Sequence, residues 1–179
     1  EQSLNLAKLA VKLNPLDEKL WLILAETQVA NRLYIEALNS LNQAQKINLN
    51  ISDTYFAKSN VYIKISQLKN AKISLEKGLR IEPNNYRAIF QLGNIFLMEK
   101  NYSEALKLFN KSIKIKPDFW QAINNKGLAY FEKNNINLSI KFFEKAISIE
   151  DNAESTLGLA SCLRIKDIKL ALQLAKKAL

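Results

Sequence analysis

The sequence has no histidine, and its 179 residues include only one cysteine, four glycines and three prolines. Without histidine the chain cannot form a Ser-His-Asp or Cys-His nucleophilic site, and it lacks the commonest zinc ligand. One cysteine excludes a disulfide within the chain. So few glycines and prolines disfavour a sandwich or barrel with many tight turns. We therefore expect a protein that is not an enzyme, without catalytic residues, cofactor or metal site.

A long hydrophobic run is also missing. The longest uninterrupted apolar stretch, Leu20 to Ala25, is far too short to cross a bilayer, and the N-terminus shows no signal-peptide pattern. We therefore expect no integral membrane segment, and with a single cysteine we expect a cytoplasmic location. The chain begins with Glu1 instead of methionine, which indicates a trimmed piece of a longer protein.

Positive charge is in excess, because 26 Lys and Arg residues stand against 17 Asp and Glu residues, a net charge of +9. Such an excess can indicate an anionic partner. It also follows from a composition rich in Lys, Asn and Ile, as expected of an AT-rich genome. We favour the second interpretation.

What the sequence does contain is an internal repeat. The step from Pro83 to Pro117 is 34, and the step from Pro15 to Pro83 is twice as long. Stepping by 34 aligns columns of small residues: Ala25, Ser59, Gly93, Gly127 and Ser161; Ser3, Ala37, Ala71, Ala105 and Ser139; Ala10, Ala44, Gly78, Ser112 and Ala146. Large apolar residues form further columns: Trp21, Tyr55, Ile89, Ile123 and Leu157; Leu41, Leu75, Phe109 and Phe143; Leu13, Ile47, Ile81, Ile115 and Ile149.

Within each repeat the apolar residues follow a helical period. Trp21 and Leu24 mark one helix, Ala37 and Leu41 mark a second, and a short polar break at residues 31–32 separates them. Small residues are needed where two helices cross closely, with neighbouring aromatic rings filling the space beside them. A proline after the second helix ends it and starts the next unit.

These columns resemble the tetratricopeptide repeat, with its pattern Trp-x2-Leu-Gly-x2-Tyr, then Ala-x3-Phe, then Pro. The unit most similar to it carries Leu92, Gly93, Phe96, Tyr102, Ala105, Phe109 and Pro117. The resemblance covers the whole chain and implies an all-α fold, a right-handed α-solenoid (superhelix) of helix-turn-helix repeats. We expect one array over residues 1–179. It comprises the second helix of a truncated repeat at 1–17, full repeats at 18–51, 52–85, 86–119 and 120–153, and a divergent final repeat at 154–179.

Some residues depart from the family pattern. Lys58 and Lys126 stand where the family has leucine, and we expect their aliphatic stems to pack while the ammonium groups reach water.

In the final repeat Ala171 and Ala178 fall two residues early, which predicts a shortened turn at 165–167. We expect missing sequence, or self-association with a second copy, to cover the leucines of the last helix: Leu170, Leu172, Leu174 and Leu179.

In this family the first helix of each pair lines a concave groove, so the resemblance predicts the site. Amide side chains there can donate to and accept from a peptide backbone, and apolar ones offer pockets for side chains. Arg87 and Lys64 could pair with a carboxylate. The predicted peptide- or helix-binding groove consists of Phe56, Asn60, Lys64, Arg87, Phe90, Gln91, Asn94, Leu97, Met98, Gln121, Asn124, Asn125, Leu128 and Phe131, with Glu132 at its edge. For Phe56 and Phe90, a structural role is as strongly favoured as ligand binding: the two rings would cover the inner edges of adjacent helices.

One subset of the family binds the acidic C-terminal tails of chaperones. It uses lysine and asparagine in an early repeat, and lysine and arginine two repeats later. Here the early positions are Phe56 and Asn60, and the later ones are Gln121 and Asn125. The missing lysine and arginine disfavour such a carboxylate clamp.

The leading hypothesis is therefore a non-catalytic scaffold that binds a protein or peptide and no small-molecule substrate. An alternative is a regulatory or substrate-recruiting region of a larger enzyme, such as a glycosyl- or sulfotransferase, or an assembly factor for a membrane complex such as photosystem I. Nucleic-acid binding by basic second helices is a third hypothesis. It is disfavoured because most Tyr and Phe residues are used in core columns, which leaves no stacking platform for bases.

Overall fold

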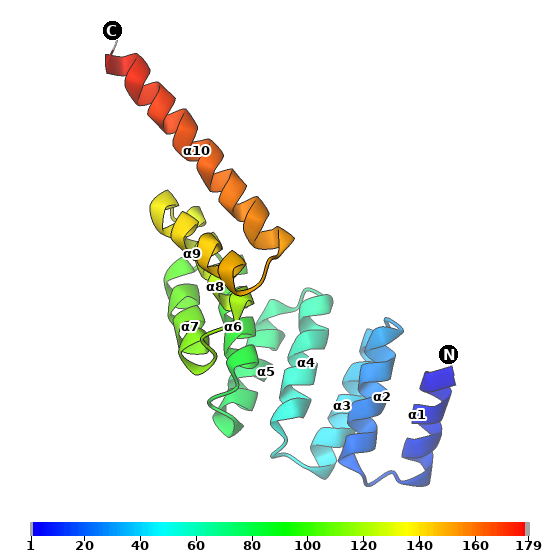
Figure 1. The fold of residues 1–179 in the computed structure, drawn as a ribbon. Coiled ribbons are helices and arrows are strands. Elements are labelled where there is room, and N and C mark those ends of the chain that lie inside the picture. The colour runs from blue at the N-terminus through cyan, green and yellow to red at the C-terminus, as the bar shows by residue number, and fades with distance from the viewer. Residues whose placement is uncertain (1, 178–179) are drawn as a thin grey trace. The chain divides into compact units, whose positions relative to one another are not determined.

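The structure is a computed structural model that describes the backbone of residues 2–177 and the side chains of residues 2–168. Over this range the secondary structure consists of ten helices and no strand (Figure 1). They are α1 (Gln2–Leu13), α2 (Glu18–Ala30), α3 (Tyr34–Ile47), α4 (Ser52–Lys64), α5 (Leu68–Ile81), α6 (Tyr86–Met98), α7 (Tyr102–Ile115), α8 (Trp120–Glu132), α9 (Ile136–Ile149) and α10 (Ala153–Lys177). The all-α fold expected from the repeat period is confirmed.

The chain forms two compact units, Glu1–Ala88 and Ile89–Leu179, with the boundary inside α6. In the first unit α2 pairs with α3 and α4 pairs with α5. In the second unit α8 pairs with α9, and α10 packs against both of them. Figure 1 shows the paired helices lying side by side and antiparallel within each unit.

The turn inside each helix pair has the same backbone geometry. Arg32, Ser66, Lys100 and Asn134 all have φ close to +60°, and each lies one full repeat after the one before. The amide that follows this residue donates to the carbonyl five residues earlier, as in Leu33 N to Gln28 O at 2.9 Å and Asn135 N to Tyr130 O at 2.9 Å. This left-handed cap ends the first helix and reverses the chain.

The final repeat does not contain the turn predicted at 165–167, because α10 is one helix from Ala153 to Lys177. That prediction is wrong for a physical reason. Ile168 stands one repeat after Asn134, and a β-branched side chain is strongly disfavoured at positive φ. Without a residue that accepts the left-handed cap, the helix continues. The leucines predicted to lie uncovered, Leu170, Leu172, Leu174 and Leu179, are outside the residues whose side chains are described.

The small-residue columns lie at the helix crossings. Ala37, Ala71, Ala105 and Ser139 are fully buried, beside the large column residues Leu41, Leu75, Phe109 and Phe143. A methyl group added at Gly93 would lie 2.7 Å from the Phe109 ring, which is fully buried and therefore held in place. At Gly127 the same methyl group would lie 3.1 Å from the Phe143 ring. The repeat thus uses glycine where an aromatic ring covers the helix backbone.

These two glycines give a matched prediction. Alanine is favoured over glycine in a helix by about 1 kcal/mol, so both Gly93→Ala and Gly127→Ala gain the same propensity. Gly93→Ala brings the new methyl group to 2.7 Å from a buried ring that must move, at a cost of about 1–3 kcal/mol, whereas at Gly127 the 3.1 Å spacing requires a smaller shift of the Phe143 ring. We expect urea unfolding to show Gly93→Ala less stable than Gly127→Ala, and equal stabilities would contradict this packing.

The two lysines that replace leucine lie in different surroundings. Lys58 in α4 is only 8% exposed, and its ammonium donates to Gln45 Oε1. The stem is therefore packed as expected and Gln45 holds the ammonium, while the expectation that this group also reaches water stays a prediction. Lys126 in α8 is partly buried, with Nζ 4.0 Å from the centre of the Phe142 ring. Burial, and then the neighbouring lysine charges, lower the pKa of both side chains.

The lowered pKa of Lys58 predicts a pH-dependent penalty on stability. Below the folded-state pKa the ammonium is charged in both states, so burial destabilises the fold to its full extent. As pH rises toward 10.5, the ordinary lysine value, the folded state releases its proton first and the penalty disappears. Leucine occupies the same column at Leu24 and Leu92. We therefore expect Lys58→Leu to stabilise the protein by on the order of 1 kcal/mol at pH 7. Chemical denaturation of both proteins from pH 7 to 10.5 should show this advantage shrinking, whereas a pH-independent difference would contradict the assignment.

Candidate peptide-binding site

A cavity of about 470 Å³ lies in the second unit between α6 and α8. Its floor and walls come from the two first helices of successive pairs, and its rim comes from the turn before α7 and the start of α7. The lining residues are Asn94, Leu97, Met98, Lys100, Tyr102, Asn125, Leu128 and Glu132.

Amide side chains in and beside this cavity form a ladder of hydrogen bonds. Asn125 Nδ2 donates to Asn94 Oδ1 at 2.7 Å, and Asn124 Nδ2 donates to Asn125 Oδ1 at 3.0 Å. Ser155 Oγ, in α10, then donates to Asn124 Oδ1 at 2.9 Å. The ladder therefore links α6, α8 and α10. It leaves the Nδ2 group of Asn94 and the second Nδ2 proton of Asn125 as unused donors among the described residues.

An exposed apolar wall stands beside these amides. Met98 is 61% exposed and Leu128 is 36% exposed, and Leu97 lies next to them at the end of α6. Apolar side chains that line a cavity in this way gain free energy when a ligand covers them. Amide donors and apolar wall together provide both kinds of contact that a peptide segment needs.

The rim of the cavity is polar. Tyr102 Oη donates to Glu132 Oε2 at 3.3 Å, which joins the start of α7 to the end of α8. Desolvation, and then the Glu132 carboxylate, raise the pKa of the Tyr102 phenol. At neutral pH the phenol therefore keeps its proton and its bond to Glu132. Lys100, at the left-handed turn position, completes the rim with the opposite charge.

Comparison with known proteins identifies the family. Models described as tetratricopeptide repeat match residues 52–85, 86–119 and 121–152, which is more than half of the chain. The chain is a tetratricopeptide-repeat protein. Such repeats build protein-interaction scaffolds that are in general not catalytic, and this chain has that scaffold. A search of curated proteins finds no match.

Solved structures share the fold of this tetratricopeptide-repeat protein. A MamA structure from Desulfovibrio magneticus is 21% identical, covers 89% of this chain and 92% of its own, and has a TM-score of 0.77. The pilF protein of Pseudomonas aeruginosa is 19% identical over 86% of this chain and 70% of its own, with a TM-score of 0.77. A tetratricopeptide-repeat protein from Thermus thermophilus is 19% identical over 89% and 88%, with a TM-score of 0.73. At these identities the similarity shows the fold alone.

The structure brings together part of the groove predicted for this tetratricopeptide-repeat protein. Five predicted residues line the cavity: Asn94, Leu97, Met98, Asn125 and Leu128. Asn124 is only 6% exposed and belongs to the ladder beneath the cavity instead of its surface. Phe90 packs edge-on against Phe119, with ring centres 5.0 Å apart, and also contacts Phe109, so it belongs to the core of the second unit. Gln91, Gln121 and Phe131 are half-buried and do not line the cavity.

Four predicted groove residues belong to the first unit: Phe56, Asn60, Lys64 and Arg87. The Phe56 ring lies directly against Gly78, so it covers a helix crossing. Arg87 extends over the ring of its neighbour Tyr86 and donates from Nε to Tyr86 Oη at 3.1 Å. Asn60 and Lys64 are exposed on α4. A role for these four residues in ligand binding stays a prediction.

Sequence reasoning missed Lys100 and Tyr102 as site residues. It placed ligand contacts only on one face of each first helix, whereas these two residues come from the turn and from the start of α7. A signal was available in the short polar break at Lys100 and Asn101, which predicts a turn directly before Tyr102. Such a turn returns the chain to the same end of each pair.

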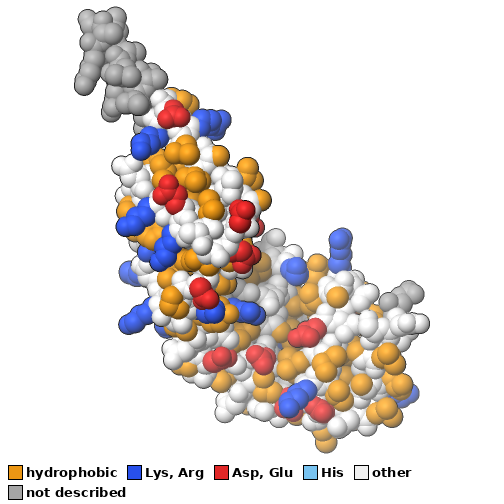
Figure 2. All heavy atoms as spheres, in the orientation of Figure 1, with side chains coloured by type: hydrophobic (Ala, Val, Ile, Leu, Met, Phe, Trp, Pro, Cys, Tyr) orange, Lys and Arg blue, Asp and Glu red, His pale blue; other side chains and the backbone are white. Residues whose placement is uncertain are grey.

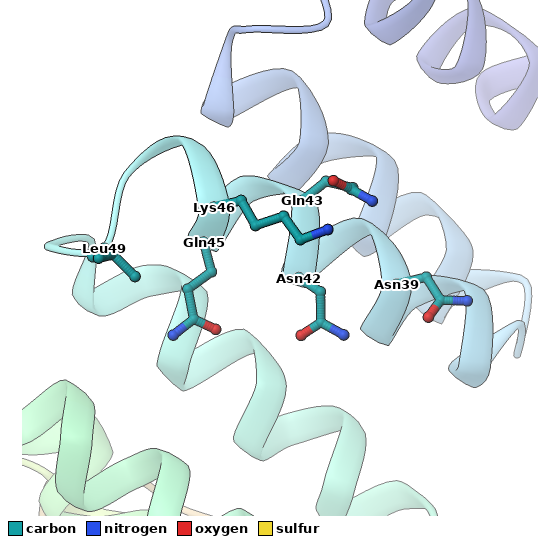
Figure 3. Close-up of a pocket in the computed structure, with 6 residues that line it drawn as sticks. All are labelled: Asn39, Asn42, Gln43, Gln45, Lys46 and Leu49. Atoms are coloured by element: carbon teal, nitrogen blue, oxygen red, sulfur yellow. The ribbon is translucent and has the colours of Figure 1, made fainter.

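The first unit has a polar groove of its own on α3. It has a volume of about 430 Å³ and is lined by Asn39, Asn42, Gln43, Gln45, Lys46 and Leu49. Figure 3 shows Asn42 and Gln45 extending to the same side of the helix. With only Leu49 as a large apolar residue, this groove offers little surface whose burial would drive binding. We therefore rank it below the cavity between α6 and α8.

Basic side chains do lie on the second helices of the tetratricopeptide pairs. Figure 2 shows them along the α7 and α9 edge of the second unit, with acidic and apolar side chains between them. Lys107 Nζ, for example, is 2.6 Å from Glu104 Oε1. Tyr130 and Phe142 stack on each other, with ring centres 5.4 Å apart, and Lys126 lies over the Phe142 ring. These rings are used inside the protein and do not form a free platform for bases.

No helix of the described residues is long and apolar enough to cross a membrane. Within the same residues, no three His, Cys, Asp or Glu side chains come together in a group that could hold a metal ion.

The amide ladder predicts unequal effects of two asparagine substitutions. Asn124→Ala removes a buried side chain and leaves the Ser155 hydroxyl and the Asn125 Oδ1 atom without a partner, so we expect a loss of about 1–3 kcal/mol. Asn94→Ala removes only the outer end of the ladder, at the partly exposed cavity floor, and should cost less than about 1 kcal/mol. Thermal and urea unfolding of the two variants measure this order. A larger loss for Asn94→Ala would show that the ladder does not stabilise the fold as described.

Proposed function

We propose that the second unit binds a peptide segment of a partner protein in the cavity between α6 and α8, without catalysis. One observation carries the proposal: unused amide donors of Asn94 and Asn125 lie beside the exposed apolar side chains of Met98 and Leu128. A surface that only needed to be solvated would not combine fixed amides with exposed large apolar residues.

The proposed contacts have distinct roles. Asn94 and Asn125 donate to backbone carbonyl groups of the ligand, which gives affinity without reading its sequence. Leu97, Met98 and Leu128 surround one apolar side chain of the ligand, and the flexible Met98 adapts to its shape. Preference for a particular ligand would then come mainly from the size of that apolar side chain.

The cavity supplies few groups for chemistry. Tyr102 and Glu132 are bonded to each other, and Lys100 is an exposed rim residue. The lining residues include no Ser, Thr or Cys side chain that could act as a nucleophile. A binding role for the second unit therefore needs fewer assumptions than a catalytic one.

A pair of charge substitutions tests the proposal. Peptides are first selected against the purified chain from a displayed random library, and their affinities are then measured by fluorescence polarisation. We expect Leu128→Asp to weaken binding at least about tenfold, because a carboxylate in the apolar wall must lose its hydration when the ligand binds. Ile115→Asp is the control, since Ile115 at the end of α7 is equally exposed, 37% against 36%, and lies outside the cavity.

Circular dichroism of both variants checks that they remain folded. If the selected peptides bind Leu128→Asp as tightly as the wild type, or if both variants lose binding equally, the ligand does not use this cavity. Failure of the library to yield any binding peptide would also count against a peptide ligand.

A further inference from the structure

A small polar cavity in the first unit lies among α3, α4 and α5, and the proposed peptide site makes no use of it. Its volume is about 150 Å³. This is about half the lower limit for pockets that hold drug-sized ligands, so it suits a single small group. The lining residues are Gln45, Tyr55, Lys58, Tyr62, Asn70, Ile73, Ser74 and Lys77.

Two lysines and no acidic residue line this cavity. Lys58 is buried, and Lys77 approaches it from α5 as an exposed side chain. Their mutual repulsion adds to the effect of burial in lowering the pKa of Lys58. A buried ammonium without a negative partner is costly, so the positive charge concentrated here favours an anion.

Neighbouring side chains hold Lys58 in place but leave donors available. Gln45 accepts a hydrogen bond from Lys58 and donates from Nε2 to Tyr55 Oη at 2.9 Å. Two ammonium protons of Lys58 and the Tyr55 hydroxyl proton therefore stay available. Lys77 adds further donors at the mouth of the cavity. Ser74, in contrast, already donates to the Asn70 carbonyl at 2.8 Å.

The corresponding place in the second unit has a different composition. Lys126 and Lys145 stand two repeats after Lys58 and Lys77, but Phe142 replaces Ser74 and Ile123 replaces Tyr55. The Lys126 ammonium lies over the Phe142 ring, which partly balances its charge. In the first unit hydroxyl and amide groups surround the Lys58 ammonium instead.

We propose that the cavity among α3, α4 and α5 binds one oxyanion group, a phosphate or a carboxylate, between Lys58, Lys77 and the Tyr55 hydroxyl. The two ammonium groups supply the charge, and Tyr55, fixed by Gln45, supplies a neutral hydrogen bond. The group could be a free ion or part of a larger molecule whose remainder stays outside, because the volume admits no more than the charged end.

The test titrates the full chain separately with sodium phosphate, sodium acetate and sodium chloride at matched ionic strength and pH 7. Binding is followed by the amide NMR signals of residues around the cavity and by the melting temperature. We expect saturable shifts with phosphate or acetate, whichever oxyanion the site prefers, and only weak, unsaturated changes with chloride.

Lys58→Leu should weaken this binding about tenfold or more, because it removes a charged donor from a desolvated site. The variant is expected to fold, since leucine fills the same column at Leu24 and Leu92. Lys77→Ala serves as a second variant on an exposed residue and should weaken binding several-fold. Lys111→Ala is the matched control, because Lys111 is exposed, stands one repeat after Lys77, and belongs to the repeat that has Leu92 in place of a buried lysine.

Loss of saturable binding in Lys58→Leu and Lys77→Ala, with retention in Lys111→Ala, supports the site. Identical responses to chloride and to the two oxyanions overturn it. Equal oxyanion binding by wild type and Lys58→Leu overturns it as well, because the charge would then be bound elsewhere on the basic surface.

Discussion

The close approach of neighbouring helices is the constraint on which the rest of the structure depends. In each repeat a small residue lets an aromatic or leucine side chain of the next helix rest against the backbone, as Phe109 does at Gly93 and Phe143 at Gly127. With the helices fixed at this separation, first helices of successive repeats come near enough for Asn94 and Asn125 to share a hydrogen bond. The polar features of the molecule therefore follow from its core packing.

A repeated core also makes unusual residues easy to interpret, because each column supplies its own comparison. Leu24, Lys58, Leu92 and Lys126 occupy one column, so a buried lysine can be compared with leucine in nearly the same surroundings. Lys126 meets an aromatic ring, whereas Lys58 meets an amide, two phenols and a second lysine. The same backbone thus holds two lysines in different surroundings, and only the Lys126 charge is partly balanced, by the Phe142 ring.

The period and columns were sufficient to predict the helices and most of the core, because both depend on residues that recur in every repeat. Features that depend on one side chain meeting another were not predictable in the same way. The continuous helix α10 follows from Ile168 at a position that requires positive φ, and column alignment does not test backbone conformation. Asn124 was expected to face a ligand, yet Ser155 and Asn125 hold it beneath the surface.

The amide ladder changes how the proposed peptide site would work. Amides that pointed freely into a groove would each lose rotational freedom when a ligand bound, at about 0.5–1.5 kcal/mol per side chain. Asn125 is bonded on both sides, and the ladder beneath it is anchored by Ser155 in α10. Its remaining donor is therefore oriented before a ligand arrives, and less entropy is lost on binding. The hydrogen bonds within the protein would thus favour ligand binding by the proposed site. The condition is that each amide keeps one donor for the ligand, and Asn94 and Asn125 both do.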